Sequence, residues 1–257
     1  MKILLNGICG FMGREVVKLC ETGYRGASLA FGVDPNGGAE VFKSFEQIGT
    51  FSGVDCIVDF SHHSATPALL DFAIANSLPL VLCTTGHTEY EIDLIHKAAE
   101  RIPLFYSGNM SLGIALLIEL AKTTAAALPE AEIEIIEKHH DRKVDAPSGT
   151  ALMLADAIRE VRPDAYTNSG RSGQGKRSQD EIGIHSIRMG NIIGEHEVII
   201  GTQSQTISLK HEAHNRALFA EGAIAAAGFI VDQLPGIYDM KSMLSSERAS
   251  DAVITAE

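Results

Sequence analysis

Residues 139–150 (HHDRKVDAPSGT) place proton-transfer groups directly before a sequence that is typical of a helix start. The imidazoles of His139 and His140 and the ammonium of Lys143 can exchange protons with a bound molecule. Pro-Ser-Gly-Thr then opens a helix, whose first turn offers backbone N–H groups at the positive end of the helix dipole. Two adjacent histidines alone would indicate a solvated polar loop. With Lys143 and Pro-Ser-Gly-Thr at this spacing, the segment predicts a site that protonates a substrate and holds its carboxylate.

A glycine-rich turn lies near the N-terminus, between a short apolar strand and a predicted helix. Gly7, Gly10 and Gly13 follow GxxGxxG spacing, a variant of the dinucleotide fingerprint in which glycine allows a tight turn and close approach to a pyrophosphate. Asp34 ends the second predicted strand, where a carboxylate can accept hydrogen bonds from both ribose hydroxyls. A purely structural turn is the alternative, but the strand–turn–helix context favours dinucleotide binding.

The residues after Asp34 bear on the choice of cofactor. Residue 35 is proline, no arginine follows the acid, and a carboxylate repels a 2′-phosphate. We therefore expect NADH as the preferred cofactor. NADPH is the alternative, because Lys43 or another nearby cation could bind its 2′-phosphate.

Two further segments, Cys83–Gly86 and Ser107–Met110, lie at the ends of predicted strands of the first half. In an open α/β sheet, ligands bind outside the carboxyl ends of the strands. Ordinary strand-to-helix turns would be the preferred interpretation without the glycine loop. With that loop, we expect the hydroxyls and backbone amides of both segments to face the nicotinamide half of the cofactor.

The elements that must position these groups change character near residue 110. Before it, short apolar strands alternate with helices, which indicates βαβ units and a mostly parallel sheet covered on both faces. The predicted strands are 2–6, 29–34, 54–60, 79–85 and 104–107, and the predicted helices are 11–22, 65–76 and 89–101.

After residue 110, the pattern predicts helices and an open antiparallel or mixed sheet. The predicted helices are 112–127, 150–161 and 215–232, and the predicted strands are 132–137, 182–189, 197–202 and 206–211. Residues 163–180 are predicted to form a long mobile loop. The fold class is therefore α/β. A Rossmann-like dinucleotide-binding domain (1–110, with 217–257 returning to it) accompanies an α+β substrate-binding and oligomerisation domain (111–216).

Composition excludes several function classes. A net charge of −12 and a pI near 5.3 disfavour binding to nucleic acid or to anionic membranes. The four cysteines have no CxxC spacing and are predicted to be small buried thiols of a cytoplasmic protein. The later histidines show neither HxxxH nor HxH spacing, so we expect no metal site. His62 and His63 are expected to be solvent-exposed loop residues.

Several motifs together carry a resemblance to a known family. They are the glycine loop, Thr84-Thr85-Gly86, SGNMSLG at 107–113 and, above all, EKHHDRKVDAPSGT at 137–150, followed by shorter matches at 170–173, 182–188, 194–196 and 211–222. These closely resemble 4-hydroxy-tetrahydrodipicolinate reductase, formerly called dihydrodipicolinate reductase, over nearly the whole chain. The resemblance implies a Rossmann-like domain, a substrate domain with an open mixed sheet, and a homotetramer.

The resemblance also implies an activity and roles for residues. The family reduces a cyclic dicarboxylate, 4-hydroxy-tetrahydrodipicolinate, to tetrahydrodipicolinate with hydride from NADH or NADPH and loss of water, in lysine biosynthesis through diaminopimelate. His139 would be the proton donor and acceptor, and Lys143 a proton donor. The substrate would be held by His140, Ser148, Gly149 and Thr150. Cofactor contacts would come from Gly7, Ile8, Cys9, Gly10, Phe11, Met12, Asp34, Cys83, Thr84, Thr85, Ser107, Gly108, Asn109 and Met110.

Two residues depart from the family pattern, and two other functions compete with the reductase. Cys83 stands where the family often has glycine, and Phe11 stands where arginine is frequent, which weakens the case for NADPH. A dinucleotide-binding redox sensor without turnover would need the glycine loop but not the pair His139 and Lys143. A metal-dependent hydrolase would need ligand spacing that the histidines lack.

Overall fold

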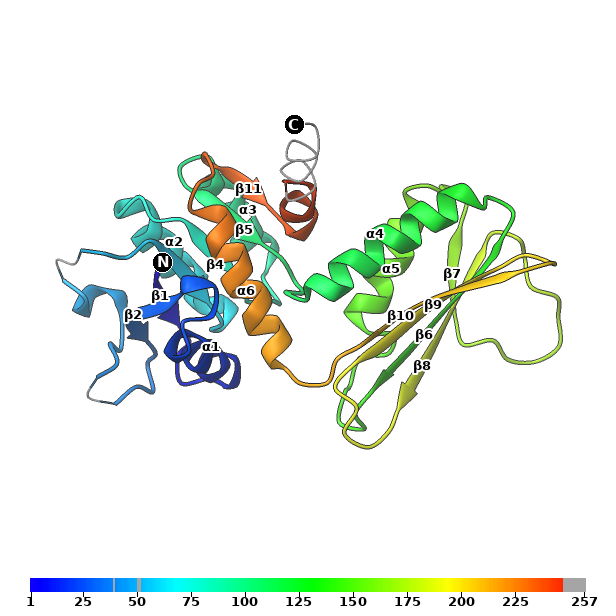
Figure 1. Cartoon of the computed structure of the whole chain (residues 1–257), viewed down its shortest axis with the longest axis horizontal. Coiled ribbons are helices and arrows are strands. Elements are labelled where there is room, and N and C mark those ends of the chain that lie inside the picture. The colour runs from blue at the N-terminus through cyan, green and yellow to red at the C-terminus, as the bar shows by residue number, and fades with distance from the viewer. Residues whose placement is uncertain (39, 50–51, 247–257) are drawn as a thin grey trace. The chain divides into compact units, whose positions relative to one another are not determined.

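The computed structural model describes residues 1–38, 40–49 and 52–246, which form two compact units. The first comprises the described residues of Met1–Ser111 and Arg216–Glu257, and the second comprises Leu112–Asn215 (Figure 1). The last residues of the predicted returning segment, 247–257, lie outside the described part of the chain.

The first unit is built on a six-stranded parallel sheet with the order β11-β5-β4-β3-β1-β2. Its two central strands are wholly buried and, apart from Asp59, apolar, as expected where helices cover both faces of a parallel sheet. This confirms the predicted Rossmann-like α/β fold. The strands are β1 (Lys2–Asn6), β2 (Ser28–Val33), β3 (Cys56–Asp59), β4 (Leu80–Leu82), β5 (Pro103–Tyr106) and β11 (Gly236–Tyr238).

Four helices pack on this sheet, and the third begins at a capping residue. Thr88 caps the third helix through a reciprocal capping box with Glu91, which satisfies N–H groups that the helix itself leaves unpaired. The fourth is apolar almost all round and packs against β3, β4, β5 and the first helix. The helices are α1 (Phe11–Glu21), α2 (Thr66–Ala75), α3 (Glu89–Ala99) and α6 (Ala217–Ile230), with 3₁₀ turns η1 (Tyr24–Gly26), η2 (Phe45–Gln47) and η3 (His63–Ala65).

The second unit is a five-stranded mixed sheet, with the order β10-β9-β6-β8-β7 and two helices on one face. β6 runs parallel to β8 and antiparallel to β9, so the predicted open mixed sheet is confirmed. Alternate isoleucines and valines of the sheet pack on α4 and α5. The elements are α4 (Leu112–Ala127), β6 (Glu132–His139), α5 (Gly149–Arg159), β7 (Tyr166–Ser169), β8 (Glu181–Arg188), β9 (Glu195–Gly201) and β10 (Thr206–Glu212).

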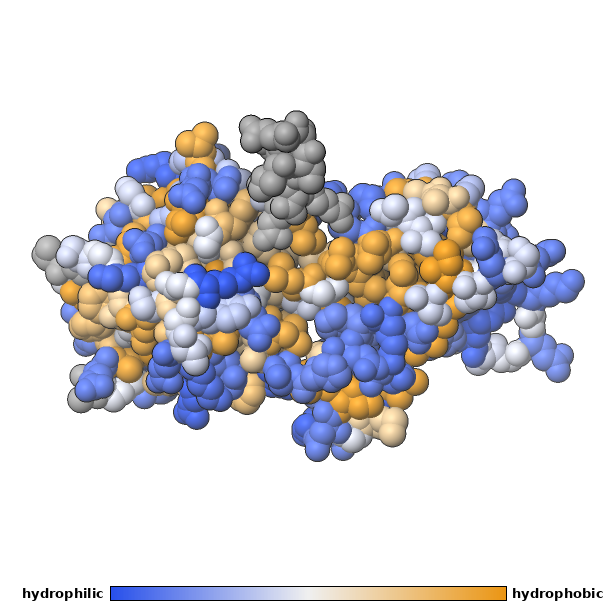
Figure 2. All heavy atoms as spheres, viewed as in Figure 1, coloured by the Kyte–Doolittle hydropathy of each residue, from blue (hydrophilic) through white to orange (hydrophobic). Residues whose placement is uncertain are grey.

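Helix α4 leaves part of its apolar surface uncovered within its own unit. Figure 2 shows hydrophobic residues over this helix, whose Leu116 and Leu120 are each 42% exposed. Within the described ranges, no helix combines the length and the apolar character that a membrane crossing requires.

The structure corrects three element predictions. β6 continues to His139, two residues beyond the predicted end, because its backbone pairing with β8 extends to that residue. The predicted loop 163–180 contains β7, a short polar strand at the edge of the sheet that pairs with β8. β11 was not predicted, because three residues after a proline carry no periodic signal.

Candidate active site

The glycine loop after β1 is closed by contacts that only glycine allows. Gly7 has a φ of +81°, and a Cβ placed on it would overlap the carbonyl oxygen of Phe60. A Cβ on Gly13 would overlap the carbonyl oxygen of Gly7. Helix α1 begins after Gly10 with no side-chain cap, so no side chain of this loop occupies its N-terminal amides. This is the local geometry that a pyrophosphate requires.

Asp34 joins this loop to the end of β2. Its side chain is buried, and its two oxygens accept hydrogen bonds from the backbone N–H groups of Cys9 (3.0 Å) and Asn36 (2.9 Å). The carboxylate is therefore held in one orientation beside the glycine loop, although the two residues lie far apart in the sequence.

At the carboxyl ends of the neighbouring strands, the hydroxyl of Thr84 turns inward. It donates to Asp59, a fully buried carboxylate at the end of β3 that also accepts from Asn6 and Ser61. Burial raises the pKa of Asp59, and these hydrogen bonds oppose the rise. The expectation that the hydroxyl of Thr84 faces the cofactor is therefore wrong, since it is committed to this carboxylate. Its backbone remains at the strand end.

The other predicted cofactor residues of these strand ends differ in exposure. Cys83 and Met110 are buried, whereas Thr85 and Gly108 are exposed. The hydroxyl of Ser107 serves a local turn, because it donates to the carbonyl oxygen of Asn109 and accepts from the N–H of the same residue. In the glycine loop, Phe11 is 59% exposed and lies under the guanidinium of Arg216, at 5.2 Å from the ring centre, and Ile8, Cys9 and Met12 are partly exposed.

The histidines after β3 are only partly the exposed loop residues that we expected. His62 is exposed, but Nδ1 of His63 lies 2.9 Å from the carboxylate of Glu91. The backbone N–H of Thr88 and the imidazole of His63 lower the pKa of Glu91 to about 2. His63 therefore contacts the capping box of α3, a role that no local pattern indicated.

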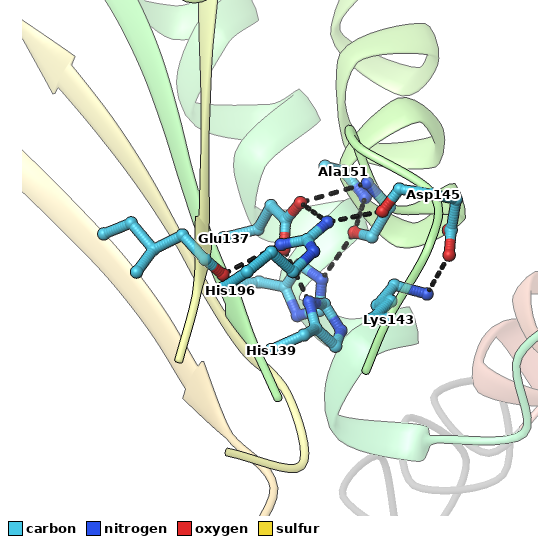
Figure 3. A network of polar contacts seen from close by, with 9 residues as sticks. Glu137, His139, Lys143, Asp145, Ala151 and His196 are labelled. Atoms are coloured by element: carbon cyan, nitrogen blue, oxygen red, sulfur yellow. Dashed lines mark hydrogen bonds and ion pairs between the residues drawn. The ribbon is translucent and has the colours of Figure 1, made fainter. Parts of the chain in front are cut away.

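In the second unit, His139 is the last residue of β6 and only 8% exposed, rather than part of a polar loop. Its Nδ1 lies 2.5 Å from a carboxylate oxygen of Glu137, which is 0% exposed. Figure 3 shows both side chains, with the ring of His196 beside them. The rings of His139 and His196 meet edge to face, with 5.1 Å between their centres.

Glu137 is surrounded by donors. Arg188 donates to both carboxylate oxygens (2.7 and 2.8 Å), and the backbone N–H of Ser148 donates to one of them (3.1 Å). Burial alone raises the pKa of Glu137, but the hydrogen bonds from His139, Arg188 and Ser186 hold it well below its usual range. Glu137 is therefore a carboxylate that can only accept.

Ser148 caps helix α5, as the Pro-Ser-Gly-Thr sequence predicted for a helix start. Its hydroxyl oxygen accepts from the N–H of Ala151 and lies 3.2 Å from Nε2 of His196. The helix begins at Gly149, one residue before the predicted start, and Thr150 follows in the first turn. This end of the helix therefore lies beside the network of Glu137.

Lys143 and His140 lie in the segment between β6 and α5. Lys143 is partly buried and forms an ion pair with Asp145, 2.8 Å between Nζ and the carboxylate, which lowers the pKa of Asp145 (Figure 3). His140 follows the last residue of β6 and is partly exposed. The structure thus brings His139, Lys143 and Ser148 into one unit, at one end of β6 and α5.

Sequence reasoning missed three residues of this network. Glu137 precedes His139 by two positions, so strand alternation, which puts both on one face, could have found it. Arg188 and His196 could not be found in this way. They pair with His139 and Glu137 only through the registers of β8 and β9. Among the described residues, no group of three acidic, histidine or cysteine side chains could hold a metal ion.

Comparison with known proteins places this geometry in a family. The model "Dihydrodipicolinate reductase, N-terminus" matches residues 1–110, and "Dihydrodipicolinate reductase, C-terminus" matches residues 113–244. The chain belongs to the dihydrodipicolinate reductase family. This confirms the resemblance seen in the sequence, and it assigns the glycine loop and the network of Glu137 to the two different parts of a dihydrodipicolinate reductase.

Individual family members match over almost their full length. The 4-hydroxy-tetrahydrodipicolinate reductase of Clostridium tetani is 42% identical over 251 residues, which cover 96% of this chain and 98% of the relative. That of Caldanaerobacter subterraneus subsp. tengcongensis is 40% identical over 247 residues, 95% of this chain and 98% of the relative. The dipicolinate-bound dihydrodipicolinate reductase of Paenisporosarcina sp. TG-14 superposes with a TM-score of 0.79 and 26% identity, covering 93% and 97% of the two chains.

Proposed function

We propose that this chain reduces 4-hydroxy-tetrahydrodipicolinate to tetrahydrodipicolinate, with hydride from a nicotinamide dinucleotide and loss of water, in lysine biosynthesis through diaminopimelate. The observation that carries the proposal is the buried imidazole of His139 beside the N-terminus of α5, in a chain of this family. A proton source and an anion-binding helix end are what the reduction of an unsaturated cyclic dicarboxylate needs. The dipicolinate bound to the Paenisporosarcina relative is a ligand of the same class.

The first unit would hold the cofactor. The amides of the glycine loop suit the pyrophosphate, and Asp34 suits the ribose. We propose NADH as the preferred cofactor because a carboxylate at this position repels a 2′-phosphate. When bound, the dinucleotide supplies the hydride. The predicted contacts at the ends of β4 and β5 remain part of this proposal through their backbone groups.

The second unit would hold the substrate and supply protons. Hydride addition to a conjugated imine builds negative charge, which an adjacent acid must neutralise. One hydride and one proton enter, and one water leaves. We assign the proton transfer to His139 and Lys143.

The same unit would bind the carboxylates. Ser148, Gly149 and Thr150 offer a hydroxyl and the first-turn amides of α5, and His140 offers a further donor. Both carboxylates then meet donors that the fold has already oriented, so binding requires little reorganisation.

The direct test is the loss of NADH or NADPH absorbance in the presence of enzymatically generated 4-hydroxy-tetrahydrodipicolinate. We expect oxidation that depends on both the enzyme and the substrate, with tetrahydrodipicolinate as the product. No oxidation with either cofactor would refute the proposed activity. Binding of NADH without turnover would instead favour a redox sensor.

We further propose that the protein is a cytoplasmic homotetramer. The family resemblance supports the assembly, and the acidic composition supports a protein that binds neither nucleic acid nor an anionic membrane. Light scattering of the purified protein tests the tetramer.

A further inference from the structure

The carboxylate of Glu137 accepts hydrogen bonds on both of its oxygens, and its partners, the hydroxyl of Ser186 included, all donate to it. One oxygen accepts from His139 and Arg188, and the other accepts from Arg188 and the N–H of Ser148. A guanidinium and a backbone amide cannot give up their protons here, and an ionised carboxylate has none to give. Nδ1 of His139 must therefore carry a proton whenever this contact exists.

The other ring nitrogen, Nε2, is then the one that gains and loses a proton. Gly194 lies beside it, and a Cβ built on that glycine would come within 3.2 Å of Nε2. We propose that Glu137 is a positioning residue that keeps Nδ1 of His139 protonated, so that Nε2 exchanges the proton with the substrate. This inference rests on the proposed function of His139.

The substitution Glu137→Gln would test the proposal, since glutamine keeps the size of the side chain but replaces one oxygen with an NH₂ group. In this variant the NH₂ group must meet either Arg188 or Nδ1 of His139, and both are donors. The matched control is Glu134→Gln. Glu134 lies on the same strand and also contacts a histidine and an arginine of the sheet, His185 (2.9 Å) and Arg177 (3.3 Å).

We expect kcat of Glu137→Gln to fall by about 10²-fold, while the affinity for NADH and the kcat of Glu134→Gln stay within about twofold of the wild type. Equal losses in the two variants would overturn the positioning role. The ¹⁵N signals of the imidazoles give a second readout on the wild-type protein, which does not depend on the variant folding. Neutral His139 should carry its proton on Nδ1, and a proton on Nε2 would overturn the inference even in an enzyme that is active. If the wild type shows no turnover, the proposed function fails, but the ¹⁵N signals still decide this inference.

A second inference comes from a different contact, between Ser148 and His196. Nδ1 of His196 is buried and finds no hydrogen-bond partner among the residues that the structure describes. A buried N–H without an acceptor costs more free energy than a bare ring nitrogen, so the proton of neutral His196 belongs on Nε2. Nε2 then donates to the hydroxyl oxygen of Ser148, which also accepts from Ala151.

We infer that His196 keeps the hydroxyl of Ser148 available as a donor. With its oxygen accepting from both neighbours, the hydroxyl has its one proton left for a substrate carboxylate. His139 and His196 therefore carry their protons on opposite ring nitrogens, although their rings are in contact.

The ¹⁵N spectrum tests this arrangement directly, because it distinguishes Nε2-protonated from Nδ1-protonated imidazole. We expect the Nε2–H form for His196, and Ser148→Ala should weaken dipicolinate binding about tenfold in a calorimetric titration without NADH. A proton on Nδ1 of His196, or unchanged dipicolinate affinity in Ser148→Ala, would overturn this inference. Neither measurement requires turnover, so both are independent of the proposed activity.

Discussion

Acidification should destabilise this protein through His196, and the structure sets the size of the effect. The side chain is 4% exposed. Burial, and then the adjacent His139, lower its pKa from 6.5 to about 3. His211 and Lys143 act in the same direction, whereas Glu137 opposes them. The imidazole is therefore neutral in the folded protein throughout the range from pH 7 to pH 5.

The unfolded chain behaves differently, because its histidine titrates near the ordinary value of about 6.5. As the pH falls below this value, the unfolded state binds a proton that the folded state does not, so the free energy of unfolding decreases. The decrease is about 1.4 kcal/mol per pH unit, which gives about 2 kcal/mol between pH 7 and pH 5. It would continue until the pH reaches the folded pKa of about 3.

The assay is urea unfolding of the wild type and of His196→Gln at pH 7 and pH 5, at one protein concentration. Glutamine keeps an N–H donor for Ser148 but does not titrate. Between the two pH values, the wild type should lose about 2 kcal/mol more than the variant. An equal loss in both proteins would mean that His196 takes up a proton in the folded state, which would refute the predicted effect of burial.

Three other predictions concern the proposed activity. His139→Gln and Lys143→Ala should each lower kcat by about 10²-fold or more in steady-state assays, because each removes a proton-transfer group. Unchanged turnover in both variants would remove segment 139–150 from the mechanism. Asp34→Ala should reduce kcat/KM with NADH more than with NADPH, because the lost carboxylate binds a ribose but repels a 2′-phosphate. Equal losses with the two cofactors would contradict the ribose assignment. Gly194→Ala should lower kcat by about tenfold, because the new methyl group lies 3.2 Å from Nε2 of His139. The affinity for NADH, measured by fluorescence titration, should not change. An unchanged kcat would argue against Nε2 as the reacting atom.

Elements with a long or continuous apolar pattern were predictable from the sequence. β1 and α4 have the predicted bounds, because their apolar runs end at residues that favour turns. The short strands β7 and β11 were missed. Their residues carry no distinctive period, and they become strands only because a neighbouring strand offers unpaired backbone groups.

The same division holds for the candidate site. Local segments indicated the glycine loop, the acid–base cluster at 139–150 and the helix start at Pro-Ser-Gly-Thr, because in each the chemistry and the turn lie within a few residues. The inward turn of Thr84 was missed, since its partner Asp59 comes from another strand. The orientation of the hydroxyl depended on a contact between strands.

By itself, the sequence determined the fold class, the family and the kinds of groups that we propose for the cofactor and dicarboxylate sites. Only the tertiary structure decided the state of those groups. His139 lies at a buried strand end, and Glu137 takes its charged partner Arg188 from β8 and its neighbour His196 from β9. The reason is physical. Burial and strand register depend on residues distant in the chain, and these set both the charge of a carboxylate and the nitrogen on which an imidazole holds its proton.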